Sequence, residues 1–129
     1  MRMNSVDSYI EFATWLDSVF PKPIPSDAVA FAFNMYEGVR SFDVQLVACG
    51  AFDEDSDDWA ANEVFSSEEN LFALGLHATS AEWDKALSAV KSLVVRYLAE
   101  GTNAIVLKQS RAVAVGFVDG DLDVLWQRA

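Results

Sequence analysis

Apolar side chains recur every three or four residues in two stretches of the chain, residues 5–20 and 80–100. This spacing places them on one face of an amphipathic helix. The "PKPIP" run at 21–25 ends the first pattern because proline cannot continue a helical hydrogen-bond ladder. Thr79 followed by Glu82 predicts a capping box before the second helix. The apolar stripe of the second helix consists of Trp83, Leu87, Val90, Val94, Tyr97 and Leu98. We therefore expect two helices, each with one face buried in a core.

Residues 28–36 and 42–49 alternate between apolar and small or polar side chains, which is typical of strands with one buried face. The "EGVRS" segment between them permits a turn, so these two stretches predict an antiparallel hairpin. A third and weaker strand is expected near 62–66 or 71–76.

The C-terminal segment carries the strongest local signal. Residues 111–118 and 122–127 alternate in the same way, and the Asp119-Gly120 pair between them is favoured in hairpin turns. We expect a second antiparallel hairpin there. The preceding "NAIVLKQS" segment, residues 103–110, fits either a short helical turn or an extended connector.

The order of elements is helix, two or three strands, helix and two strands. Hairpins favour antiparallel pairing, and two amphipathic helices need an apolar sheet face to cover. The sequence therefore predicts an α+β fold, a two-layer sandwich in which two helices cover an antiparallel sheet of four to five strands. Its 129 residues are expected to form one domain.

The composition indicates a folded, acidic protein. Hydrophobic residues make up 52% of the chain, enough for a substantial core, while the formal net charge is −11. Nucleic acids and anionic membrane surfaces select for Lys and Arg, so neither is expected as a partner. Asp7, Glu11 and Asp17 interrupt the N-terminal region where a secretory signal needs an apolar run, and no stretch approaches a membrane span. We expect a cytoplasmic location.

The negative charge is concentrated in one part of the chain. No Lys or Arg occurs between Arg40 and Lys85, whereas that interval contains eleven acidic residues. Five of them occupy the six positions 53–58, and Trp59 follows directly. Such carboxylates repel one another and cannot be buried without compensating cations, so this segment is expected at the surface.

A calcium loop is one reading of this run, because Asp53, Asp55 and Asp57 stand at the first, third and fifth positions of an EF-hand pattern. The pattern requires Gly at the sixth position and Glu at the twelfth, where this chain has Asp58 and Val64. We therefore expect no metal site.

Catalytic patterns do not stand out. Cys49 is the only cysteine and lies within a predicted strand, and His77 is the only histidine. Nothing places them together, and no glycine-rich phosphate loop or zinc pattern can be written. Twenty acidic residues always contain close pairs, but nothing selects any pair for acid–base work. We expect neither enzymatic activity nor a cofactor.

A protein partner of opposite charge fits the acidic segment better. A basic partner, in particular a nuclease with a cleft lined by Lys and Arg, would be steered onto this surface, where carboxylates take the place of substrate phosphates. Trp59 is expected either to anchor the loop on the sheet or to act as an aromatic anchor at the interface. The remaining tryptophans, Trp15, Trp83 and Trp126, are expected to be partly or fully buried. The candidate partner-binding residues are Asp53, Glu54, Asp55, Asp57, Asp58, Trp59, Glu63, Glu68 and Glu69.

The chain resembles small immunity proteins of bacterial polymorphic-toxin and contact-dependent growth inhibition systems. The resemblance is carried by the order of elements and by two segments, "FDVQLVACGAFDEDSDDWAANEVF" (42–65) and "AVAVGFVDGDLDVLWQR" (112–128). The resemblance lies in size, acidity, α+β order and the lack of an active-site motif. It implies that the protein binds one cognate toxin domain and neutralises it in the cytoplasm of the producing cell. Two alternatives stay open: an accessory domain whose acidity serves solubility, and a small-ligand-binding domain that uses the aromatic face of the sheet.

Overall fold

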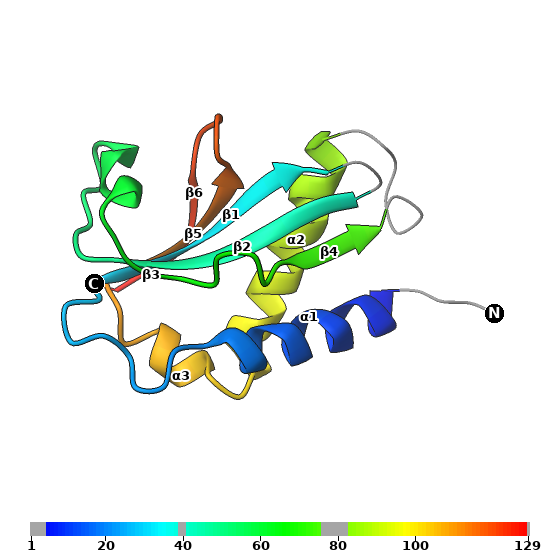
Figure 1. Cartoon of the computed structure of the whole chain (residues 1–129), viewed down its shortest axis with the longest axis horizontal. Coiled ribbons are helices and arrows are strands. Elements are labelled where there is room, and N and C mark those ends of the chain that lie inside the picture. The colour runs from blue at the N-terminus through cyan, green and yellow to red at the C-terminus, as the bar shows by residue number, and fades with distance from the viewer. Residues whose placement is uncertain (1–4, 39–40, 76–82, 129) are drawn as a thin grey trace.

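The computed structural model describes residues 5–38, 41–75 and 83–128, in which helices pack against one face of a β-sheet (Figure 1). The predicted α+β class and the helices on the inner sheet face are confirmed. The elements are α1 (Ser5–Val19), β1 (Ala30–Glu37), β2 (Ser41–Cys49), the 3-10 helix η1 (Asp57–Ala61), β3 (Glu63–Ser66), β4 (Phe72–Gly75), α2 (Trp83–Glu100), α3 (Ala104–Leu107), β5 (Ala112–Phe117) and β6 (Asp123–Gln127). The expected capping box at Thr79 and Glu82 lies outside the described residues.

The described strands form a six-stranded sheet in the order β3-β2-β1-β5-β6, with β4 also paired to β2. The expectation of a purely antiparallel sheet is wrong, because β1 and β5 are parallel. Since β4 is antiparallel to β2, and β2 to β1, β4 also runs parallel to β5. Between β4 and β5 the chain passes through α2 and α3, and such a helical crossover returns it to the same end of the sheet. Alternation of side chains defines the faces of a strand but not its direction, so the sequence did not indicate this pairing.

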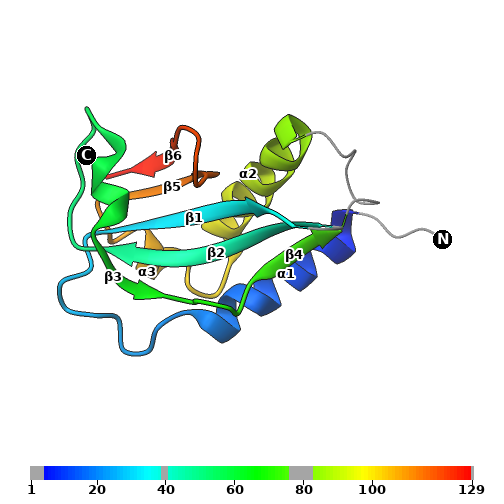
Figure 2. The same cartoon turned by 45° about the horizontal axis from the view of Figure 1, so that its top comes forward.

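Both candidate regions for a weaker strand are strands, and both pair with β2. β3 pairs with the end of β2 at Val47–Cys49, whereas β4 pairs with its beginning at Ser41–Val44. Figure 2 shows the two short strands following one another along this edge of the sheet. The ambiguous segment 103–110 contains the short helix α3.

The core lies between the helices and the inner face of the sheet. β1 directs Phe31, Phe33 and Met35 into it, as the alternation predicts, and all three are buried. Phe12 of α1 lies at the centre, with its ring 5.9 Å from that of Phe33 and 6.4 Å from that of Tyr97. The Phe12 and Tyr97 rings meet edge to face and the Phe33 ring is tilted, and aromatic packing of this kind adds to the burial of apolar area.

A polar network ties α1 to α2 at the margin of this core. The Tyr97 hydroxyl donates a hydrogen bond to Oδ1 of Asp17 at 2.5 Å and accepts one from the backbone N–H of Asn103 at 3.0 Å. The Asn103 side chain also donates to Oδ1 of Asp17, at 3.3 Å. Burial and the Asp17 carboxylate raise the pKa of Tyr97 to about 12. Gly101 is required beside it, since a Cβ at that position would lie 2.5 Å from the Tyr97 ring.

Val90→Asp should abolish cooperative unfolding, because Val90 is 0% exposed in the core and an unpaired charge there costs several kcal/mol. Val95→Asp on the same helix is the control: Val95 is 52% exposed, and the variant should unfold near the parental temperature. Circular dichroism melting measures both. Equal melting temperatures for the two variants would contradict the assigned faces of α2.

Tyr97→Phe should destabilise the protein at pH 7 by about 1–3 kcal/mol, because it removes hydrogen bonds to a carboxylate and to a backbone N–H. The folded pKa of Tyr97, about 12, is above the ordinary value of 10.0, so its contribution is complete below pH 10 and is lost as the pH rises through 12. Urea unfolding at several pH values should show a smaller alkaline decline in the variant than in the parent. The same decline in both proteins would refute the role of Tyr97.

Candidate functional site

The outer face of the sheet, away from the helices, is covered by the segment that contains the acidic run. Trp59 of η1 packs there and is 5% exposed. Its ring lies 5.3 Å from that of Phe52 in an edge-to-face contact. The strands present mostly small side chains beneath it, namely Ala30, Ala32, Val47, Cys49, Ala112 and Ala114. In Figure 1, η1 accordingly lies on the opposite side of the sheet from α1 and α3.

Of the two roles that the sequence left open for Trp59, the structure therefore supports the anchoring of the loop on the sheet. A buried Trp59 offers little surface to a partner. Local hydrogen bonds order the acidic loop around it. The backbone N–H of Asp55 donates to Oδ1 of Asp53 at 2.8 Å, and that of Asp58 to Oγ of Ser56 at 3.2 Å. The five carboxylates of residues 53–58 stay exposed. The structure thus presents them on an anchored loop.

One hydrogen bond joins this loop to the β5–β6 connection. Oδ2 of Asp57 accepts the backbone N–H of Leu122 at 3.0 Å. The predicted hairpin is confirmed, and Asp119 and Gly120 lie in its connection, residues 118–122, where the Gly120 N–H donates to the Phe117 carbonyl oxygen at 2.9 Å. The chain folds back over Gly116, where a Cβ would lie 2.4 Å from the backbone oxygen of Asp121. Glycine permits this approach, and it brings further carboxylates next to the acidic loop.

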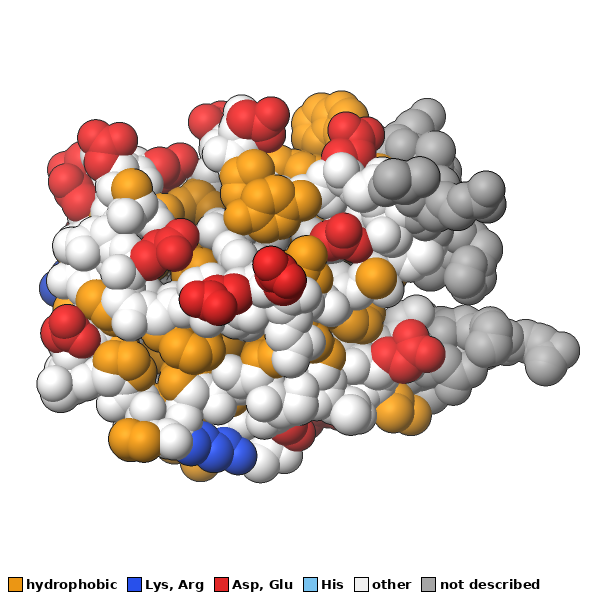
Figure 3. All heavy atoms as spheres, in the orientation of Figure 1, with side chains coloured by type: hydrophobic (Ala, Val, Ile, Leu, Met, Phe, Trp, Pro, Cys, Tyr) orange, Lys and Arg blue, Asp and Glu red, His pale blue; other side chains and the backbone are white. Residues whose placement is uncertain are grey.

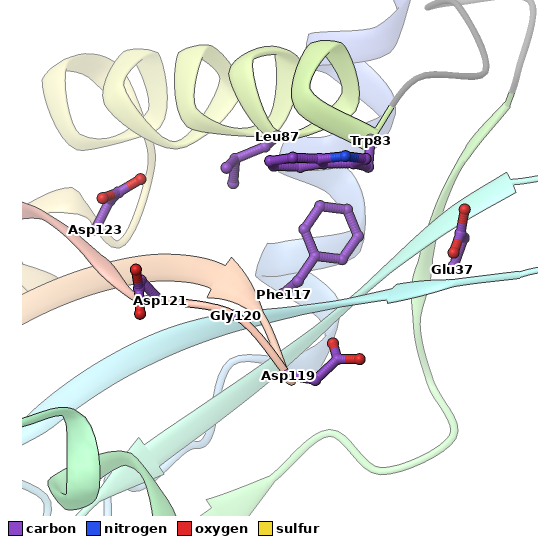
Figure 4. Close-up of a pocket in the computed structure, with 8 residues that line it drawn as sticks. All are labelled: Glu37, Trp83, Leu87, Phe117, Asp119, Gly120, Asp121 and Asp123. Carbon is purple, nitrogen blue, oxygen red and sulfur yellow. The ribbon is translucent and has the colours of Figure 1, made fainter.

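A pocket of about 530 Å³ opens beside the β5–β6 connection. In Figure 4, Trp83 and Leu87 project from α2 towards Phe117, while carboxylates surround them. The Trp83 ring is edge-to-face with that of Phe117, with centroids 6.1 Å apart. The pocket is lined by Glu37, Trp83, Leu87, Phe117, Asp119, Gly120, Asp121 and Asp123.

The expected burial of Trp83 is wrong, because its side chain is 60% exposed. Trp83 shares the helical spacing of Val90 and Val94, but it stands in the first turn of α2, where the helix passes the end of β5. Sequence reasoning missed this pocket. The available signals were an aromatic residue at a helix start and three aspartates within 119–123.

The charge of the pocket is incompletely compensated. Nζ of Lys91 pairs with Oδ2 of Asp123 at 2.5 Å. Within the part of the chain that the structure describes, Glu37, Asp119 and Asp121 have no ion-pair partner. In Figure 3, carboxylates gather along the upper part of the face around exposed apolar side chains, and the basic side chains in view lie at its margins. We call residues 53–58 and the pocket carboxylates Glu37, Asp119, Asp121 and Asp123 the acidic surface.

The three candidate glutamates lie elsewhere. Glu63 begins β3, and Glu68 and Glu69 follow it in the connection to β4, all exposed. The side chain of Gln45 on β2 donates to the backbone oxygen of Glu68 at 3.1 Å, which fixes this connection at the β2 edge. The structure therefore brings residues 53–58 together with the β5–β6 connection and leaves Glu68 and Glu69 along the β2 edge, whereas Glu63 lies opposite Cys49, next to η1.

Cys49 is fully buried beneath η1, and burial, reinforced by the nearby Glu63 charge, raises the pKa of its thiol to about 11. A protonated, inaccessible thiol packs against its neighbours and does not act as a nucleophile. His77 lies outside the described residues. Among the described side chains, no three His, Cys, Asp or Glu residues are arranged to hold a metal ion. No helix in the described ranges has the length and apolar character needed to cross a membrane.

The acidic surface has the chemistry to bind cations. Clustered carboxylates raise the local concentration of positively charged groups, and an exposed tryptophan binds ammonium or guanidinium groups on its ring face. Comparison with protein-family models, curated proteins and solved structures found no match for this chain.

Trp59→Ala should lower the free energy of unfolding by about 3 kcal/mol or more, the usual cost of truncating a buried aromatic side chain. Trp83→Ala is the matched control and should cost no more than about 1 kcal/mol, because most of that side chain is already in solvent. Urea unfolding of both variants measures the difference. Similar losses would show that the two tryptophans are not distinguished by burial.

Proposed function

We propose that this protein is an immunity protein, which binds a basic toxin domain, such as a nuclease, through the acidic surface and blocks it. The observation that carries the proposal is the joining of two acidic segments by the hydrogen bond from Leu122 to Asp57. Together they present the five carboxylates of 53–58 and those of the pocket. Among the described residues, Lys91 forms an ion pair with one of these carboxylates, that of Asp123. A surface of one sign attracts and orients a partner of the other sign.

The anchored loop supports a binding role over a role in solubility alone. Solubility needs only charge, whereas binding gains affinity when the charges are held in fixed positions before the partner arrives. Trp59 and the Asp57–Leu122 hydrogen bond hold the acidic loop in place. Neutralising an enzyme by occupying its cleft requires no catalysis and no cofactor from the inhibitor, and an immunity protein of this kind would act in the cytoplasm of the producing cell.

The pocket favours a second candidate, a domain that binds a small cationic molecule. Its volume of about 530 Å³ lies within the range of small-ligand sites, roughly 300–1,000 Å³. Such a ligand would raise the melting temperature by itself. An immunity protein would instead form a tight complex with the product of a neighbouring reading frame, which makes that product the first partner to test.

The triple variant Glu54→Gln, Asp55→Asn and Asp58→Asn should associate with that partner about tenfold more slowly at low salt. Its association rate should also depend less on salt concentration, because long-range attraction sets the encounter rate. Asp53 and Asp57 are retained because their carboxylates accept backbone hydrogen bonds. Stopped-flow or surface-based kinetics over a range of ionic strength measures the effect.

The control is the triple variant Glu11→Gln, Glu68→Gln and Glu69→Gln, which changes the net charge equally at exposed positions on α1 and in the β3–β4 connection, away from the acidic loop. It should slow association by a smaller factor. If both variants associate at the parental rate at every salt concentration, the acidic loop is only a solvated surface and the proposal fails.

A further inference from the structure

The pocket beside α2 combines an exposed tryptophan, packed against the half-buried Phe117, with several carboxylates. Trp83 is 60% exposed and is held against Phe117, with their planes at 84°. Tryptophan is highly buried on average, so a mostly exposed tryptophan that lines a pocket marks a candidate contact site. Carboxylates from three elements, β1, the β5–β6 connection and β6, surround this pair. The occupant should therefore have both a flat or apolar part and a positive charge.

We propose that this pocket receives an arginine side chain from the basic partner, an inference that rests on the proposed function and names its principal contact. Guanidinium is planar and stacks on a tryptophan face, while its N–H groups reach carboxylates on both sides. Asp119 and Asp121 are available for this pairing, since neither has an ion pair among the described residues.

Lys91 explains which carboxylates remain open. Its ammonium group pairs with Asp123 and reduces the negative charge at the α2 side of the pocket. The uncompensated carboxylates are those of Asp119 and Asp121 in the connection and Glu37 at the end of β1. An entering cation is therefore drawn to the open side of the pocket, next to the acidic loop that Asp57 links to Leu122. The pocket and the loop form one continuous surface for one partner.

The first experiment needs no partner protein. N-acetyl-arginine amide is titrated into the protein, and the indole N–H signals of the tryptophans are followed by NMR, with Trp83→Phe identifying the Trp83 signal. The Trp83 signal should shift in a saturable, salt-sensitive way. The citrulline analogue, which has nearly the same shape and no charge, should bind about tenfold more weakly or not at all.

Variants of the pocket should move this affinity in opposite directions. Asp119→Asn with Asp121→Asn should weaken arginine binding several-fold, whereas Lys91→Met should strengthen it because a competing cation is removed. Ile105→Ala, which truncates an exposed side chain on α3, should leave it unchanged. The inference is overturned if citrulline and arginine analogues shift Trp83 equally, or if the charge variants have no effect.

The second experiment separates this inference from the proposed function. With the toxin domain bound, Trp83→Ala should raise the dissociation rate about tenfold or more, as expected of a buried anchor. If the complex is sensitive to the loop carboxylates but Trp83→Ala dissociates at the parental rate, the function stands and the pocket inference fails. If the arginine analogue binds at Trp83 as described but no basic toxin binds, the pocket is a guanidinium site, while the proposed function fails and with it the toxin as the source of the arginine.

Discussion

The structure depends on an asymmetry between the two faces of β1. Its odd-numbered residues, among them Phe31 and Phe33, are large and pack against the helices, whereas Ala30 and Ala32 face the other way. The large residues give the domain its core. The small ones leave an apolar surface against which Trp59 packs and is buried. Without that surface the acidic loop would lose its apolar anchor, and its carboxylates repel one another.

The acidic surface is a product of the fold and is not a property of one segment. Asp57 and Leu122 lie 65 residues apart and are joined by a single hydrogen bond. The back-folded chain at Gly116 makes this possible, and it also aligns Asp119 and Asp121 with Trp83. Fixed charges around an exposed aromatic ring supply both the charge and the flat contact area that a cationic group can use. They are best explained as a surface prepared for a positively charged partner, which is the basis of the immunity function that we propose.

The two predictions about tryptophans show where sequence reasoning succeeds and fails. Trp59 follows an acidic run, and the sequence left open whether it faces the sheet or a partner; the sheet buries it. Trp83 has the same helical spacing as Val90 and Val94, yet it is exposed. Spacing shows which face of a helix is apolar, but it does not show how far along the helix the sheet extends to cover that face. The candidate site was therefore predicted in its acidic loop and missed in its pocket.

The sequence by itself determined the α+β class, the inner face of each central strand and the exposure of the acidic run, because these follow from local periodicity and the cost of burying charge. Only the tertiary structure decided that β5 runs parallel beside β1, and that residues 53–58 meet residues 119–123. The direction of β5, and the contact between residues 53–58 and 119–123, depend on how the α2–α3 crossover returns the chain to the sheet. That path is set by the packing of whole layers, which no local pattern of residues specifies.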